Sequence, residues 1–232
     1  MYFLATLYFN GYGCDKDYSL AFRYFSKADE LGFIKARIDI AKMYLKGLGV
    51  EKDVNKGTSI LIELVDQGNL KAILLVSEMY LDGIYFEKDE KKYFDLITRA
   101  SELGFDEANY YLGMCYFMGR GVEKDIKKAF DYFSLGAEQK DSKCYYMLGL
   151  YYSQGEIVEK NHAIASHWFM TAALSGEKRA MYNLAIYYEN GIYLSKDIEK
   201  AVYWYEKSAE LGFEKAKERL NLLLEEKRKD NF

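Results

Sequence analysis

The chain contains few residues that could catalyse a reaction, and their spacing does not favour an active site. His162 and His167 are the only histidines among the 232 residues, and they lie five positions apart. A pair of metal ligands on one helix needs a spacing of four, and no cysteine or acidic cluster accompanies these two. A nucleophile with a histidine base would have to use one of them, and nothing in the neighbouring sequence supports that arrangement. We therefore predict no catalytic residue, no metal site and no cofactor.

The three cysteines, Cys14, Cys115 and Cys144, give no sign of a metal or disulfide framework, because their number is odd and their spacing is unpaired. We expect three free thiols, each serving as a small buried apolar residue. The 18 glycines form neither a G-x-G-x-x-G fingerprint nor a P-loop. Nucleotide binding is therefore not expected.

The carboxylates that could act in pairs recur instead at a fixed step of 36 residues. The positions are Asp17, Asp53, Asp89, Asp125, Asn161 and Asp197. One carboxylate per 36 residues is too sparse for a catalytic pair. Glycine and tyrosine keep the same step, at Gly11, Gly47, Gly83, Gly119, Gly155 and Gly191, and at Tyr8, Tyr44, Tyr80, Tyr116, Tyr152 and Tyr188. A period of this length predicts a tandem array of helical repeats.

Each period is interpreted as two helices. From Ala36 the apolar residues follow a helical spacing up to Gly47, which suits the left-handed position after a helix end. A short loop leads to Asp53, whose carboxylate can accept from the free N–H groups of a second helix. That helix ends at Gly68. A column of small residues (Ala5, Ala41, Ser77, Gly113, Gly149 and Ala185) would let neighbouring helices approach closely.

The segment from Ala108, "ANYYLGMCYFMGRGVEKDIKKAFDYFSLGAEQ", resembles the Sel-one-like repeat (SLR) family, a branch of the tetratricopeptide-like helical arrays. The resemblance covers the whole chain. It implies an all-α fold, a right-handed α-α superhelix (solenoid) of six 36-residue helix-turn-helix repeats plus a C-terminal capping helix. We expect a single repeat domain over residues 1–232. Its expected repeats are 1–35, 36–71, 72–107, 108–143, 144–179 and 180–215, with a capping helix at 216–232.

The resemblance implies a non-enzymatic scaffold or adaptor that binds a partner protein or peptide. A cysteine-rich branch of the family has been described with β-lactam binding or hydrolysis, and this activity is the alternative. That branch carries paired cysteines in each repeat, which this chain lacks, so no catalytic residue is transferred from it.

The two ends of the array lead to different expectations. Leu220, Leu223 and Leu224 should face inward in a capping helix whose outer face is charged. The first helix has no preceding cap and would expose apolar side chains, including Phe3. Either the chain is a fragment, or that end meets a partner or a second copy, so self-association through the first repeat is one possible use.

Composition restricts the partners and the compartment. Half of the residues are apolar and no run approaches the ~18 that a spanning helix needs, so we expect no membrane insertion. The net charge of −4 argues weakly against nucleic acid. No signal peptide is recognisable. A cytoplasmic protein is expected, or a secreted or periplasmic one if a leader was removed.

In the resembled arrays the first helices of the repeats line a concave face. In the second repeat the corresponding positions are Lys35, Ile38, Asp39, Lys42, Leu45 and Lys46. In the fourth and fifth repeats the matching columns are richer in apolar and aromatic residues: Tyr110, Tyr111, Met114, Phe117, Met118, Tyr146, Met147 and Leu150. Lys143 and Arg179 belong to a mostly basic edge. These residues predict a groove for an apolar or aromatic peptide segment with acidic flanks. Alternatively, Tyr110 and Tyr146 pack between repeats as core.

Overall fold

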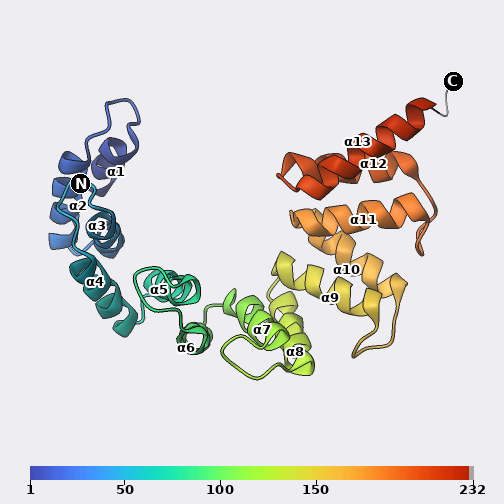
Figure 1. Ribbon diagram of the computed structural model, residues 1–232, viewed down its shortest axis with the longest axis horizontal. Helices are drawn as coiled ribbons and strands as arrows, with labels where there is room; N and C mark the ends of the chain where they lie inside the picture. Colours follow the sequence, from blue (N-terminus) through green and yellow to red (C-terminus); the bar gives the residue numbers. More distant parts are fainter. Residues whose placement is uncertain (230–232) are drawn as a thin grey trace. The chain divides into compact units, whose positions relative to one another are not determined.

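The computed structural model describes residues 1–229, and the side chains of residues 1–226. Within that range the secondary structure consists of α-helices joined by short turns, without a strand. The chain divides into two compact units, Met1–Phe105 (unit 1) and Asp106–Phe232 (unit 2). Figure 1 shows both units as stacks of paired helices. This confirms the predicted all-α repeat fold, and the expectation of a single domain over residues 1–232 stays a prediction.

Six helices form unit 1: α1 (Tyr2–Asn10), α2 (Tyr18–Glu30), α3 (Ile34–Lys46), α4 (Val54–Asp66), α5 (Leu70–Asp82) and α6 (Glu90–Glu102). Unit 2 contains α7 (Ala108–Met118), α8 (Ile126–Glu138), α9 (Ser142–Gln154), α10 (His162–Leu174), α11 (Lys178–Asn190), α12 (Ile198–Glu210) and α13 (Glu214–Lys229). We call the odd-numbered helices A helices and the even-numbered ones B helices. Inside each unit every helix packs against the next one along the chain.

The recurring residues act as helix caps, as predicted. Asp53 accepts a hydrogen bond from the backbone N–H of Lys56, and Asp125 does the same for Lys128. The backbone N–H of Asp53 also donates to the carbonyl of Tyr44, which fixes the loop between the two helices. Gly47 ends α3 with φ 68°, a left-handed conformation that costs glycine little. The period in the sequence is therefore a period of helix starts and helix ends.

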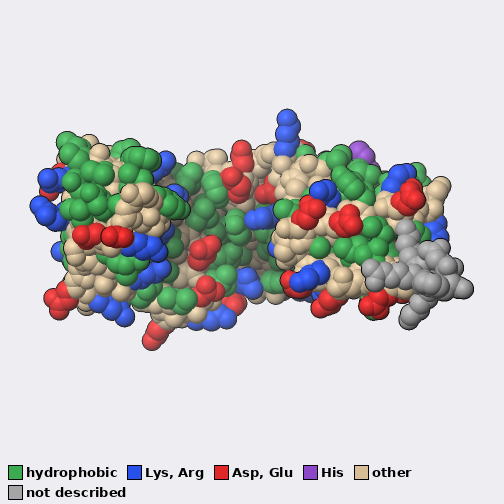
Figure 2. Space-filling view, turned by 90° about the horizontal axis from the view of Figure 1, so that it is seen from above, with side chains coloured by type: hydrophobic (Ala, Val, Ile, Leu, Met, Phe, Trp, Pro, Cys, Tyr) green, Lys and Arg blue, Asp and Glu red, His purple; other side chains and the backbone are tan. Residues whose placement is uncertain are grey.

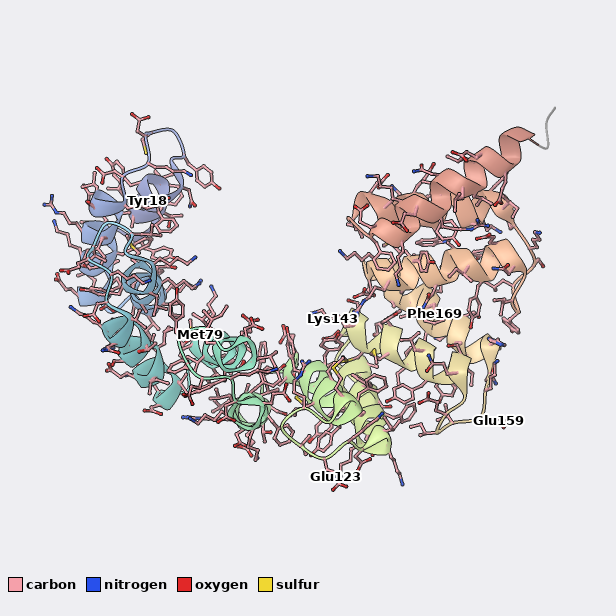
Figure 3. The ribbon with its side chains drawn as sticks, in the orientation of Figure 1. Tyr18, Met79, Glu123, Lys143, Glu159 and Phe169 are labelled. Atoms are coloured by element: carbon pink, nitrogen blue, oxygen red, sulfur yellow. The ribbon has the colours of Figure 1, made fainter. Side chains whose placement is uncertain are left out.

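Small residues on the A helices leave space for large residues on the B helices. In unit 1, Ala5 is fully buried in a cluster with Phe25 and Met43. In unit 2, a Cβ atom added at Gly149 would lie 2.6 Å from the ring of Phe169. Figure 3 shows Phe169 on α10, inside unit 2. The core of each repeat thus depends on a close approach between its two helices.

Among residues 1–229, three non-glycine residues adopt a positive φ: Tyr85 (67°), Lys140 (65°) and Tyr193 (62°). All three stand where most other repeats have glycine. Each non-glycine residue in this region carries backbone strain, since its Cβ crowds the neighbouring peptide. The fold keeps the turn geometry at these positions and accepts the strain.

Several expectations about exposure were wrong in detail. Cys14 is exposed, because it lies in the loop after α1, whereas Cys115 and Cys144 are buried; all three are free thiols. Leu223 is buried, but Leu224 is exposed, because only one side of α13 packs against the preceding repeat. Phe3 is 74% exposed as expected. The part of the predicted capping helix at 230–232 lies outside the described residues.

Candidate functional site

The predicted binding columns of unit 2 lie along α7 and α9, and most of their residues are part-exposed. Met118 is 52% exposed, near the end of α7. Met114 and Leu150 are half-buried and pack against the hydrophobic cluster around Phe133. Phe117 is half-buried in the same way. These side chains on α7 and α9 therefore form a largely apolar strip, and Met118 is its most exposed member.

Met147 does not belong to this strip. Only 5% of its surface is exposed, and it belongs to the same buried cluster as Phe133 and Tyr151. Its column lies at the border of the core, where an unbranched and flexible side chain can turn inward and fill a gap. The expectation that Met147 faces solvent was therefore wrong.

Lys143 and the two tyrosines of α7 come together as a group. The Lys143 Nζ lies 5.1 Å from the ring centre of Tyr110 and 5.5 Å from that of Tyr111, within the range of a cation–π contact. The rings of Tyr110 and Tyr111 meet edge-on at 5.5 Å. Lys143 is exposed at the start of α9 (Figure 3), and no carboxylate is paired with it among the described side chains. Its charge remains available to an acidic ligand.

Arg179, unlike Lys143, is already paired with a carboxylate of the same chain. Its Nε lies 2.8 Å from Oε1 of Glu177, which is buried, and its guanidinium stands 4.6 Å from the ring centre of Tyr146. The hydrogen bond that Arg179 donates to Glu177 raises the pKa of Arg179 above its usual value. Arg179 was expected to form a basic edge with Lys143, but its charge is already compensated within the chain.

Tyr110 and Tyr146 also contact the core. Tyr110 lies 6.2 Å from Phe133 and Tyr146 lies 6.1 Å from Phe169, measured between ring centres. Burial raises the pKa of Tyr146. The alternative that these two tyrosines pack between helices is supported, although both remain half-buried and keep a part of the ring at the surface.

Sequence reasoning missed two hollows on the A helices of unit 1. One, of about 300 Å³, lies between α1 and α3 and includes Phe9 and Phe25. The other, of about 480 Å³, lies between α3 and α5 and is partly walled by Tyr85. Lys42 and Lys46 line both hollows. The sequence held one sign of the second hollow, because Tyr85 stands where other repeats have a loop glycine. The hydroxyl of Tyr85 donates a hydrogen bond to the carbonyl oxygen of Leu45, 3.4 Å away.

The two histidines play separate roles. His162 lies with Nδ1 2.9 Å from the hydroxyl of Tyr187, and His167 packs against Trp168 with ring centres 5.6 Å apart. Among the described residues no group of three or more histidine, cysteine or acidic side chains could hold a metal ion.

The face drawn in Figure 2 mixes lysines and arginines with carboxylates and hydrophobic side chains, so no charge of one sign covers it. None of the helices described by the structure has the length and apolar character needed to cross a bilayer.

Several solved structures of bacterial repeat proteins are similar to the chain. It is 27% identical to a protective antigen present in uropathogenic Escherichia coli strains, which displays an SLR fold, with a TM-score of 0.72 over 96% of this chain. It spans 48% of that protein's length. A Sel1 repeat protein from Oxalobacter formigenes is 28% identical, with a TM-score of 0.77 over 90% of this chain and 85% of its own length. An immunity protein from Pseudomonas aeruginosa, 21% identical over 89% of this chain and 81% of its own length, shares the fold with a TM-score of 0.55. No curated protein matches the chain significantly.

The repeat boundaries also agree with a family model. The Sel1 repeat model matches residues 1–33, 34–69, 70–105, 106–141, 142–177 and 178–213. These boundaries fall two residues before those expected from the sequence, since they begin each repeat close to the start of its A helix. Members of this family are generally non-catalytic protein-interaction scaffolds. The helical repeats, the capping pattern and these matches together establish that the chain belongs to the Sel1 repeat family.

Proposed function

We propose that this chain is a non-enzymatic scaffold that binds a partner protein through the A helices of unit 2. The partner segment is an apolar or aromatic peptide with acidic residues beside it. It lies along the strip formed by Met114, Phe117, Met118 and Leu150, and continues past Tyr111 to Lys143.

The observation that carries this proposal is the exposure of Met118 at the end of α7, together with an unpaired Lys143 beside Tyr110 and Tyr111 at the start of the same helix. A solvent-facing methionine with half-buried apolar neighbours is a surface that monomers rarely keep without a use. Methionine adapts to different ligand shapes because its side chain is unbranched and polarisable. Lys143 then supplies charge complementarity to a carboxylate on the ligand, which mainly provides specificity and a faster association.

The contribution of Arg179 differs from that of Lys143. Because Glu177 already pairs with the guanidinium, a second carboxylate from the ligand would have to compete with it. We therefore assign the recognition of acidic residues to Lys143, and to Arg179 the task of holding the Tyr146 ring in place through the 4.6 Å stacking contact.

The test is a selection of random peptides displayed on phage against the purified chain, because no host or partner needs to be known. We expect enrichment of peptides that combine an aromatic or large apolar residue with Asp or Glu. Binding of these peptides should fall at least five-fold in Lys143→Glu. Lys71→Glu is the matched control, since Lys71 is the exposed residue at the same repeat position in unit 1.

Two results would contradict the proposal. Enrichment of basic peptides alone would reverse the assigned charge complementarity. Equal loss of binding in Lys71→Glu and Lys143→Glu would move the binding surface away from α7 and α9.

The β-lactam alternative has no observation in its favour, and a chromogenic β-lactam incubated with the chain should turn over no faster than in buffer.

A further inference from the structure

A hollow of about 410 Å³ opens in unit 2 between α8, α9 and α10. Two pairs of aromatic side chains contribute to its walls. Phe130 meets Tyr152 edge-on at 6.2 Å, and Tyr145 stacks on Trp168 at 5.5 Å, both measured between ring centres. All four rings are half-buried, so each keeps part of its surface at the hollow.

This hollow is separate from the strip proposed above. On α9 it uses Tyr145, Leu148 and Tyr152, whereas the strip uses Leu150. At about 100° per residue, these two sets of positions point to nearly opposite sides of the helix. A ligand in the hollow therefore touches none of the residues assigned to the peptide strip.

The hollow has one carboxylate and no permanently cationic side chain in its wall. Glu138 at the end of α8 contributes an exposed carboxylate, His167 on α10 contributes an imidazole, and no lysine or arginine belongs to the wall. Glu138 makes no ion pair with any side chain that the structure describes. The hydroxyls of Ser134 and Thr171 also line it. Aromatic faces together with an unpaired carboxylate favour a cation, because the ring quadrupole and the carboxylate attract the same charge.

The full set of four rings occurs in this pair of repeats alone. One repeat later, Ser166 and Met181 occupy the positions of Phe130 and Tyr145, so two of the four rings are missing. One repeat earlier, Asn109 stands at the position of Tyr145, whereas the other three positions are aromatic. Tyr145 is therefore the ring that the repeat pattern does not explain.

We propose that this hollow binds an arginine side chain of a partner protein. A guanidinium is planar, stacks on aromatic faces and can donate two parallel hydrogen bonds to one carboxylate, which an ammonium cannot do. Glu138 accepts from the guanidinium, and the rings of Tyr145, Tyr152 and Trp168 contact its faces. The chain then has two recognition sites on opposite sides of α9, one for an acidic segment and one for an arginine.

The experiment follows the indole N–H signal of Trp168 by nuclear magnetic resonance in the full chain. The chain has two tryptophans, so a Trp204→Phe variant assigns the signal. The probes are acetyl-Gly-Arg-Gly-amide, its lysine counterpart and its citrulline counterpart, which keeps the shape of arginine without the charge. We expect a saturable shift with the arginine peptide, at least five-fold weaker binding of the lysine peptide, and no saturable shift with citrulline.

Two variants test the role of the carboxylate. Glu138→Gln should weaken binding of the arginine peptide at least five-fold without changing the fold, because Glu138 is exposed. Glu102→Gln, at the same repeat position in α6, should leave it unchanged. Equal shifts with arginine and citrulline, equal binding of lysine, no response of Trp168, or unchanged binding in Glu138→Gln would each overturn the proposal.

Discussion

The A helices of the two units use the same columns for different surfaces. In unit 1 the columns hold Lys42, Lys46 and Glu78, and two hollows remain open beside the lysines. In unit 2 the same columns hold Met114 and Leu150, which pack against the hydrophobic cluster below them. The backbone caps are the same in both units. The repeat therefore fixes where a side chain stands, and its identity alone decides whether the surface is open and charged or filled and apolar.

The same contrast extends into the core. The column of Leu45, which is 2% exposed in unit 1, holds Glu189 in unit 2, which is 9% exposed. Glu189 accepts hydrogen bonds from Tyr205 and Arg219 and so ties α11 to α12 and α13. Burial alone would raise the pKa of Glu189, but the hydrogen bonds from Arg219 and Tyr205 outweigh it and lower the pKa. The same column thus holds Leu45 by apolar packing in unit 1 and Glu189 by a buried ion pair at the end of unit 2.

The largest expected loss of stability comes from removing the negative charge of Glu189. Glu189→Gln leaves Arg219 with only the more exposed Glu226 as an ionic partner. We expect the free energy of unfolding of unit 2 to fall by about 3 kcal/mol, as for other broken buried pairs. Chemical denaturation followed by tryptophan fluorescence reports on unit 2, because Trp168 and Trp204 both lie there. Glu226→Gln is the control, with an expected loss below about 0.5 kcal/mol.

This ion pair also predicts a pH dependence. Because the folded-state pKa of Glu189 is lowered, its contribution is fully present above the unfolded value of about 4.3. It is lost as the pH falls through the folded-state pKa. The difference in unfolding free energy between the wild type and Glu189→Gln should therefore shrink in acid. A difference that stays constant from pH 7 into that range would contradict the ionic role.

A smaller loss is expected where helices approach closely. In Gly149→Ala the added Cβ would lie 2.6 Å from Phe169. Overpacking costs about 1–3 kcal/mol and the better helix propensity of alanine offsets about 1 kcal/mol of it, so we expect a net loss of up to about 2 kcal/mol. Adding Phe169→Leu should make the Gly149→Ala change nearly neutral. Strictly additive losses in this double-mutant cycle would show that the two residues are not coupled.

The smallest expected changes in the free energy of unfolding come from turn residues, and they should have opposite signs in the two units. Gly47 and Lys140 both adopt a left-handed conformation, with φ 68° and 65°. Gly47→Ala should lower the free energy of unfolding by about 1 kcal/mol, whereas Lys140→Gly should raise it by about 1 kcal/mol because it removes the strain. Denaturation curves followed by circular dichroism measure both. Changes of the same sign would mean that strain at the turn does not control either position.

The backbone pattern could be predicted from the sequence because each signal acts locally. Gly47 and Asp53 mark a helix end and a helix start by their own conformational preferences, and their recurrence shows the repeat. The apolar strip on α7 and α9 followed from the same register. Met118 is exposed as predicted, whereas its use in binding stays a prediction.

The remaining features depend on side chains from different helices. Met147 turns inward, Glu177 pairs with Arg179, and Glu189 is buried with Arg219. None of these pairings follows a repeat column, so the period gave no signal for them. The period also gave no signal for the hollow between α8, α9 and α10, because its lining combines side chains from three helices.

The most direct test of the binding surface is the dissociation constant of one selected acidic–aromatic peptide for two variants of the chain. Met118→Lys and Asp82→Lys change the same repeat column in unit 2 and unit 1, and both positions are exposed. If the partner lies along α7 and α9, Met118→Lys weakens binding at least ten-fold by placing a charge in the apolar strip, and Asp82→Lys leaves it unchanged. Unchanged binding in Met118→Lys, or an equal loss in Asp82→Lys, would contradict the account.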